Sequence, residues 1–260
     1  MTAQLKSHSQ GQTLVLTISN PEHRNALDPA MYSAGVEALN VAETNPDVKS
    51  VILTGEGAHF CAGGNLNRIL ANRAAAPEQQ AEGIDALHSW VEAIRTFPKP
   101  VIAAVEGAAA GAGFSLVLAC DMVVAAADSV FVMAYSSVGL SPDGGGSWFL
   151  ARAMPKALVN EFMLLGERIP AQRLLDAGLL NQLAPKGEVL SHALVLAQRL
   201  NVRAPNALAS IKELTESAYG HDLFTHLKAE KQQFLKNLNH ANAQIGVEAF
   251  LNKQTPHYKP

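Results

Sequence analysis

Short runs of β-branched and aliphatic residues recur through the first half of the chain. Such runs are typical of buried strands when polar or glycine-containing turns separate them. Five segments are therefore expected to be strands: 13–19, 50–54, 101–105, 122–125 and 130–133. Their spacing leaves room for a helix or a loop after each of the first three strands.

Helical patterns occupy the segments between these strands. Asp28-Pro29 supplies an N-cap and a proline at the first helical position, and apolar residues follow at Tyr32, Val36 and Leu39. A second apolar stripe with helical spacing comprises Ile84, Leu87, Val91 and Ile94. Alternating strands and helices are typical of a layered α/β protein.

The character of the chain changes after Gly144. Helical stripes dominate from there on, and Pro170 and Pro205 are expected to start helices. Gly166, Gly178 and Gly220 are expected to end them. The pattern predicts that the last third of the chain is entirely helical.

Charge and composition exclude several classes of partner. The net charge is -3, and no basic run is present that would attract nucleic acid or an anionic membrane surface. The uncharged stretch from Gly107 to Cys120 is shorter than the roughly 20 residues that cross a bilayer. The first residues lack the features of a secretory signal, so a cytoplasmic location is expected.

Common site signatures are incomplete in this sequence. The segment from Gly111 to Leu116 lacks the third glycine of a dinucleotide fingerprint, and no glycine loop continues into Lys-Ser/Thr. Val117 replaces the second small residue that would be needed for a nucleophilic Ser115. The histidines are scattered, and Cys61 and Cys120 lack a zinc-binding spacing, so no metal site is predicted.

Two glycine-rich loops remain, at 55–66 and 106–115, each directly after an expected buried strand. Loops of small residues expose backbone N–H groups, and the second loop also opens a helix. The two loops could converge on one developing oxyanion. For either loop taken alone, tight packing between a strand and a helix explains the small residues as well as an oxyanion-binding role does.

Six segments, taken in order, resemble the enoyl-CoA hydratase/isomerase (crotonase) superfamily over essentially the whole chain. They are Asn20-Pro-Glu-His-Arg-Asn25-Ala-Leu, Phe60-Cys-Ala-Gly-Gly-Asn-Leu66, Pro100-Val-Ile-Ala-Ala-Val-Glu-Gly107 with Gly111-Ala-Gly113, Val138-Gly-Leu-Ser-Pro-Asp-Gly-Gly-Gly-Ser147, Gly166-Glu-Arg-Ile-Pro-Ala-Gln and Ala249-Phe-Leu-Asn-Lys253. The resemblance implies an α/β spiral of strand-strand-helix repeats over residues 1–200. It also implies a C-terminal helical region at 201–260 that assembles a homotrimer or a hexamer.

The resemblance also assigns roles to individual positions. The N–H groups of Gly64 and Ala112 would hold the thioester oxygen of an acyl-CoA substrate. The remaining CoA contacts would be Ala62, Asn65 and Leu66 along the adenine and pantetheine path, Arg24 near the phosphates, and Lys253 reaching the CoA of an adjacent subunit. CoA arrives with the substrate, and no metal, flavin or nicotinamide cofactor is implied.

The acid/base positions depart from the hydratase pattern. Ser115 and Tyr135 stand where hydratases of the family carry two glutamates, so both are expected to contact substrate without acting as paired acids. Asp143 stands where double-bond isomerases of the family carry a single catalytic acid, although Pro-Asp-Gly is also a strong turn sequence. One carboxylate suffices for an allylic shift, because it can remove a proton and return it elsewhere. An isomerase is predicted.

Two alternatives stay open. Asp143 could activate water in an enoyl-CoA hydratase or in a ring-opening, oxepin-CoA-type hydrolase. A protein of another class, a non-catalytic acyl-CoA-binding scaffold, could keep the two loops without using Asp143. The pattern Pro-Asp-Gly-Gly-x-x-Trp, which ends at Trp148, most resembles the subgroup that acts in aromatic-acid catabolism.

Overall fold

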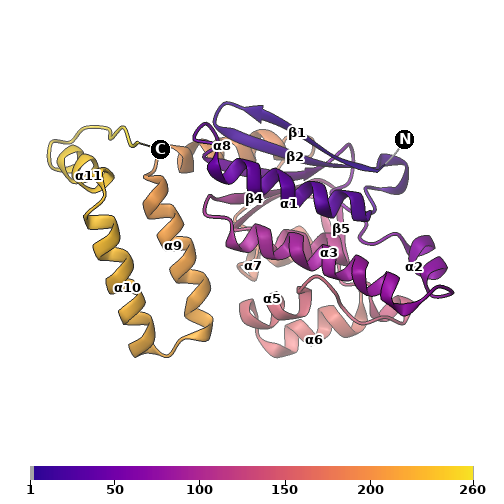
Figure 1. Cartoon of the computed structure of the whole chain (residues 1–260). Coiled ribbons are helices and arrows are strands. Elements are labelled where there is room, and N and C mark those ends of the chain that lie inside the picture. Colours follow the sequence, from indigo (N-terminus) through magenta and orange to yellow (C-terminus); the bar gives the residue numbers. More distant parts are fainter. Residues whose placement is uncertain (1–2, 260) are drawn as a thin grey trace.

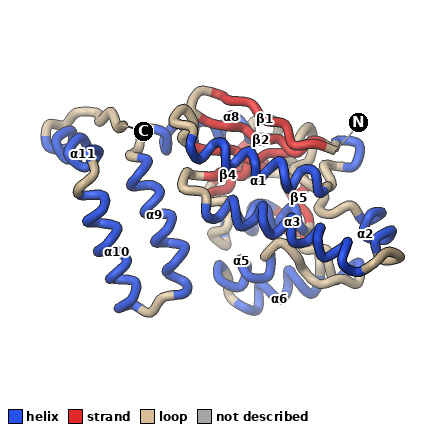
Figure 2. The backbone as a smooth tube through the Cα atoms, in the orientation of Figure 1, coloured by secondary structure: helices blue, strands red, loops and turns tan. Residues whose placement is uncertain are grey.

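The computed structural model describes residues 3–259 and has a mixed α/β architecture built around two sheets (Figure 2). The larger sheet has the spatial order β1 (Gln4–Gln10), β2 (Thr13–Ser19), β3 (Ser50–Gly55), β4 (Val101–Val105), β6 (Met122–Ala126) and β9 (Gln182–Ala184). β1 pairs with β2 antiparallel, and the other neighbouring strands are parallel. The smaller sheet contains β5 (Ala108–Ala110), β7 (Val130–Val132) and β8 (Ile169–Pro170). The α/β fold class predicted from the sequence is confirmed.

Helices surround the larger sheet and continue beyond it. Those of the layered part are α1 (Pro29–Thr44), α2 (Leu66–Asn72), α3 (Pro77–Thr96), α4 (Ala112–Ala119), α5 (Gly146–Ala153), α6 (Lys156–Leu165), α7 (Ala171–Asp176) and α8 (Val189–Asn201). The C-terminal helices are α9 (Pro205–Ser217), α10 (Leu223–Leu238) and α11 (Ala241–Leu251), and three 3-10 turns occur at Pro21–His23, Ser136–Val138 and Ala218–Gly220.

The central strands of the larger sheet are buried on both faces, and their alternate residues enter two separate cores. On β3, Val51 and Leu53 join the core that includes residues of α1, α3 and α4. Ile52 points to the opposite face and packs with Val189 and Ala193 of α8. Burial on both faces explains why the parallel strands read as continuous apolar runs.

The C-terminal helices α9, α10 and α11 lie beside the layered core, at the end of the molecule opposite α2 (Figure 1). Two ion pairs connect α9 to the core: Lys212 lies 2.8 Å from Asp121, and Glu216 pairs with Arg95. Lys212 also donates a hydrogen bond to the carbonyl of Ile94 at 3.1 Å. The division into units at residue 200 stays a prediction.

The expectation of an entirely helical last third is wrong. β9 pairs in parallel with β6, which places Gln182 opposite Val124 at the edge of the larger sheet. Asn181, just before β9, accepts a hydrogen bond from the N–H of Val123 at 2.7 Å. These bonds satisfy backbone groups at the sheet edge, so a strand forms without a long apolar run.

None of the helices within residues 3–259 combines the length and the apolar character that crossing a membrane requires.

Candidate active site

The two glycine-rich loops are bonded to each other in a fixed register. Cys61 of the first loop forms an isolated parallel bridge with Ala109 of β5. Its N–H donates to the carbonyl of Ala108 at 3.0 Å, and its carbonyl accepts from Ala110 at 2.9 Å. A Cβ atom on Gly113 would lie 2.7 Å from the Cβ of Cys61, so this approach requires glycine. Burial raises the pKa of the Cys61 thiol to about 12, which makes it a neutral packing residue.

This register leaves two backbone N–H groups available to a ligand. Ala112 is the first residue of α4, so its N–H has no acceptor within the helix. Gly64 follows Gly63, whose φ of +89° turns the first loop. Among residues 3–259, neither N–H donates to a protein acceptor. Gly64 and Ala112 both line one cavity of about 370 Å³.

Asp143 lines the same cavity, and two side chains hold it in place. The hydroxyl of Tyr135 donates a hydrogen bond to Oδ1 of Asp143 at 2.6 Å. Ser115 donates to the backbone carbonyl of Asp143 at 3.1 Å. Burial, together with the charge of Asp143, raises the pKa of Tyr135, so the phenol stays protonated and remains a donor.

Glycines after Asp143 bring this turn close to α4. A Cβ on Gly146 would lie 2.8 Å from Oγ of Ser115, and Gly144 has a φ of +61°. Larger residues at these positions would push the turn away from Ser115. The triple glycine therefore positions Asp143 relative to the N–H of Ala112.

The cavity brings together six of the residues predicted from the sequence: Ala62, Gly64, Leu66, Ala112, Tyr135 and Asp143. Ser115 is fully buried and is not part of the lining, so it supports the Asp143 turn from within. Asn65 does not line the cavity either. Its side chain caps α2 by accepting hydrogen bonds from the N–H groups of Asn67 and Arg68.

Arg24 and Lys253 lie outside this cavity. Arg24 is exposed on the turn after β2 and has a left-handed φ of 51°. Lys253 is exposed and follows α11. The helix α11 lies at the far end of the molecule from α2 (Figure 1). The CoA-binding roles of Arg24, Asn65 and Lys253 stay predictions.

Sequence reasoning missed the contribution of α3 to the site. Gln80, Ile84 and His88 are spaced four residues apart and all line the cavity. The spacing shows that they share a helix face, but it does not show that this face meets the glycine loops.

A second, larger cavity of about 800 Å³ adjoins the first and shares part of its lining. The shared apolar residues are Leu66, Ile69, Ile84, Val138 and Leu140. The polar centre around Asp143 therefore opens beside an apolar space large enough for a sizeable hydrocarbon group.

Comparison with known proteins shows the family to which the chain belongs. The family model described as "Enoyl-CoA hydratase/isomerase" matches residues 8–260. The chain belongs to the enoyl-CoA hydratase/isomerase family. The protein is thus an acyl-CoA enzyme of this family, and the resemblance stated from its sequence motifs is confirmed.

Relatives within the family include proteins named as isomerases and proteins named as hydratases. The chain is 34% identical to 1,2-epoxyphenylacetyl-CoA isomerase of Escherichia coli over 97% of each chain. It is also 34% identical to 2,3-dehydroadipyl-CoA hydratase of the same organism over 96% of each chain. Among solved structures, an enoyl-CoA hydratase from Polaromonas sp. JS666 is 62% identical with a TM-score of 0.97, over 98% of this chain and 100% of the other.

Proposed function

We propose that the protein shifts a carbon–carbon double bond in an enoyl-CoA thioester, with Asp143 as the single acid/base group. One observation supports this most directly. Within the described part of the chain, Asp143 is the only carboxylate lining the cavity that presents the N–H groups of Gly64 and Ala112. A reaction that needs one proton carrier and one oxyanion site fits this set of groups.

The proposed reaction begins with a β,γ-enoyl thioester. The Asp143 carboxylate takes a proton from the α-carbon, and the electron pair of that C–H bond moves into the thioester carbonyl to form a dienolate. The N–H groups of Gly64 and Ala112 donate to the negative oxygen, and such a donor contributes about 3 to 4 kcal/mol in acyl-transfer enzymes. The Asp143 carboxylic acid, whose proton exchanges with water during the lifetime of the dienolate, then delivers a proton to the γ-carbon, which leaves an α,β-enoyl thioester and restores the carboxylate. CoA enters as part of the substrate, and this proton transfer requires no other cofactor.

The adjoining apolar cavity supports the proposal that the acyl group of the substrate is apolar. Its shared lining supplies leucine, isoleucine and valine side chains, which favour a hydrocarbon or aromatic acyl group over a strongly polar one. The name of the relative 1,2-epoxyphenylacetyl-CoA isomerase is compatible with such a group and with a role in aromatic-acid catabolism.

The first prediction tests the reaction type. We expect the purified protein, incubated in deuterated water with a panel of β,γ- and α,β-enoyl-CoA esters, to incorporate deuterium into at least one ester. Mass spectrometry separates the possibilities, because isomerisation exchanges protons while hydration adds the mass of water. Hydration as the main outcome would favour the hydratase or hydrolase that uses the same Asp143. Tight binding of the esters without either reaction would favour a non-catalytic acyl-CoA-binding protein.

We also propose that the C-terminal helices assemble the protein into a trimer or a hexamer. Large apolar side chains on these helices are exposed in the single chain: Ile211, Leu223, Phe224, Leu227, Phe234, Leu235, Leu238, Val247, Phe250 and Leu251. So many exposed apolar residues in one region are typical of a surface that contacts another protein.

The second prediction follows from this surface. Light scattering at micromolar concentration is expected to give three or six times the chain mass of 27.6 kDa. Replacing Phe234 and Leu238, which are 68% and 55% exposed, by glutamate should lower the measured mass. A parent protein with the mass of one chain would contradict the proposal.

A further inference from the structure

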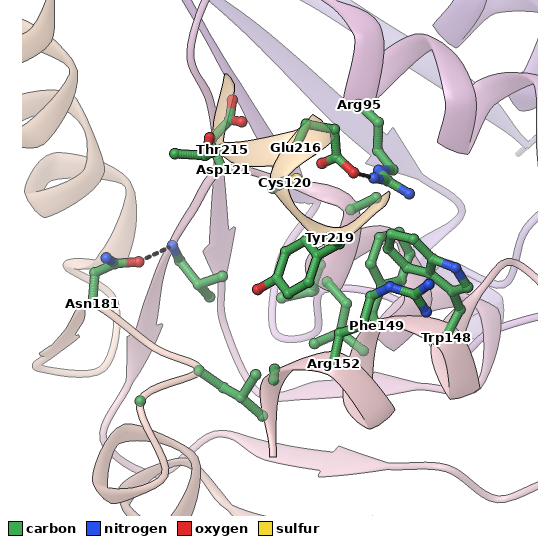
Figure 3. A pocket seen from close by; sticks show the side chains of 17 residues that line it. Arg95, Cys120, Asp121, Trp148, Phe149, Arg152, Asn181, Thr215, Glu216 and Tyr219 are labelled. Carbon is green, nitrogen blue, oxygen red and sulfur yellow. Dashed lines mark hydrogen bonds and ion pairs between the residues drawn. The ribbon is translucent and has the colours of Figure 1, made fainter. Parts of the chain in front are cut away.

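A separate cavity of about 350 Å³ lies between the core and the first C-terminal helix (Figure 3). It shares no lining residue with the candidate active site. Its walls come from the end of α4, from α5 and from the α9 segment that includes Thr215 and Glu216. The proposed isomerase reaction therefore gives this cavity no role.

The charges around this cavity do not balance. Asp121 is occupied by Lys212 and by the N–H of Val101, which donates to it at 2.7 Å. Glu216 is paired with Arg95. Within the described residues, no carboxylate lies within ion-pair distance of Arg152. One positive charge on the wall of the cavity is left without a counter-charge.

Arg95 brings a second guanidinium to the wall of the cavity, with its charge offset by Glu216. Its Nε is buried and has no hydrogen-bond acceptor among the described residues. Burial, together with the charge of Arg152, lowers the pKa of Arg95, although a guanidinium stays protonated at neutral pH. Because Glu216 offsets the charge of Arg95, the positive charge available to an anion in this partly desolvated place is that of Arg152.

Aromatic rings lie beside these two cations. The guanidinium of Arg152 lies 3.7 Å from the centre of the Trp148 ring, and that of Arg95 lies 4.2 Å from it. Phe149 stands at 88° to Trp148, and Tyr219 also lines the cavity (Figure 3). Trp148 is 36% exposed, so a ligand can reach these rings from solvent. The two guanidinium groups cover the faces of Trp148, but a guanidinium stacked through its flat face still presents N–H groups at its edge. The edge of Arg152 can therefore bind a carboxylate, while Phe149 and Tyr219 offer apolar surface to a flat body.

We propose that this cavity binds a small aromatic carboxylate, with Arg152 as the partner of the carboxylate and the aromatic side chains holding the ring. The volume of the cavity is at the lower end of the range for ligand sites, which limits the ligand to a single ring or a molecule of similar size. Because Arg152 lies on α5 and Tyr219 follows α9, the bound ligand would connect the core to the C-terminal helices.

The third prediction uses benzoate as the probe and isothermal titration of the whole oligomeric protein as the measurement. We expect the parent protein to bind benzoate and to bind benzamide, its neutral isostere, at least about tenfold more weakly, as the loss of one charge-assisted contact implies. Arg152→Gln should weaken benzoate binding by a similar factor. Arg199→Gln, which changes an exposed arginine of α8 away from the cavity, should leave it unchanged.

The comparison of benzoate with benzamide needs no variant, so it holds even if Arg152→Gln folds poorly. No benzoate binding by the parent at millimolar concentration would overturn the proposal. Equal binding of benzoate and benzamide, or unchanged benzoate binding in a folded Arg152→Gln protein, would overturn it as well. Displacement of benzoate by an enoyl-CoA ester would place the probe in the active site and would count against the second cavity.

Discussion

Asp143→Asn is expected to reduce the rate of enoyl-CoA isomerisation at least about 100-fold, the lower end of what a positioned acid/base group contributes. The amide is close in size to the carboxylate, and its oxygen can still accept the hydrogen bond from Tyr135. The backbone carbonyl that accepts from Ser115 is unchanged. The substitution therefore removes the proton acceptor while keeping the turn. The rate of deuterium exchange into a β,γ-enoyl-CoA ester measures the effect.

Asp85→Asn is the matched control for this variant. Asp85 is exposed on α3 and does not line the cavity, so its replacement should leave the exchange rate unchanged. The thermal midpoint and the affinity for an enoyl-CoA ester should stay near the parent values in both variants. If the Asp143→Asn protein exchanged substrate protons as fast as the parent, the isomerase proposal would fail.

The central strands could be predicted from the sequence because each is buried on both faces. β2, β3 and β4 read as apolar runs, and their observed bounds agree with the expected ones to within one residue. β1 escaped prediction because most of its residues are polar and exposed, and it forms an antiparallel edge beside β2. Its strand character comes from pairing with β2, which periodicity within Gln4–Gln10 does not reveal.

β5 was missed for a different reason. Ala108–Ala110 has neither β-branched side chains nor alternation, and the sequence indicated a loop there. The segment is extended because it pairs with β7 on one side and bonds to Cys61 on the other. Both partners are distant in the sequence, so only the folded chain shows why three alanines form a strand.

The parts of the candidate site that could be predicted from the sequence are those whose functional residues lie together in one short segment. The two glycine loops and Asp143 each lie in such a segment, and the family resemblance assigned roles to them. The contact between Tyr135 and Asp143 could not be found in this way, because it depends on how the 3-10 turn at Ser136–Val138 folds back. The resemblance placed Ser115 against the substrate, whereas its buried position beneath the Asp143 turn depends on the close approach of Gly146.

A large effect is also expected when one of the two oxyanion donors is removed. Ala112→Pro removes the N–H of the first residue of α4, and proline is well tolerated at that helical position. If this N–H holds the dienolate oxygen, turnover should fall by roughly 100- to 1,000-fold, the loss seen when one oxyanion donor is removed. The steady-state rate with a β,γ-enoyl-CoA ester is the measurement.

Proline at position 112 could also act by distorting the second glycine loop, so the control has to isolate the lost donor. Ala241→Pro makes the same change at the first residue of α11, which is exposed and does not line the cavity. It should keep full turnover, because the N–H that it removes faces no substrate. The Ala112→Pro protein should keep the parent's thermal midpoint and still bind an enoyl-CoA ester, because the remaining cavity lining and the N–H of Gly64 are retained. A stable Ala112→Pro variant with unchanged turnover would show that this N–H does not stabilise the dienolate, and Gly64 would then be the only backbone donor left in the proposal.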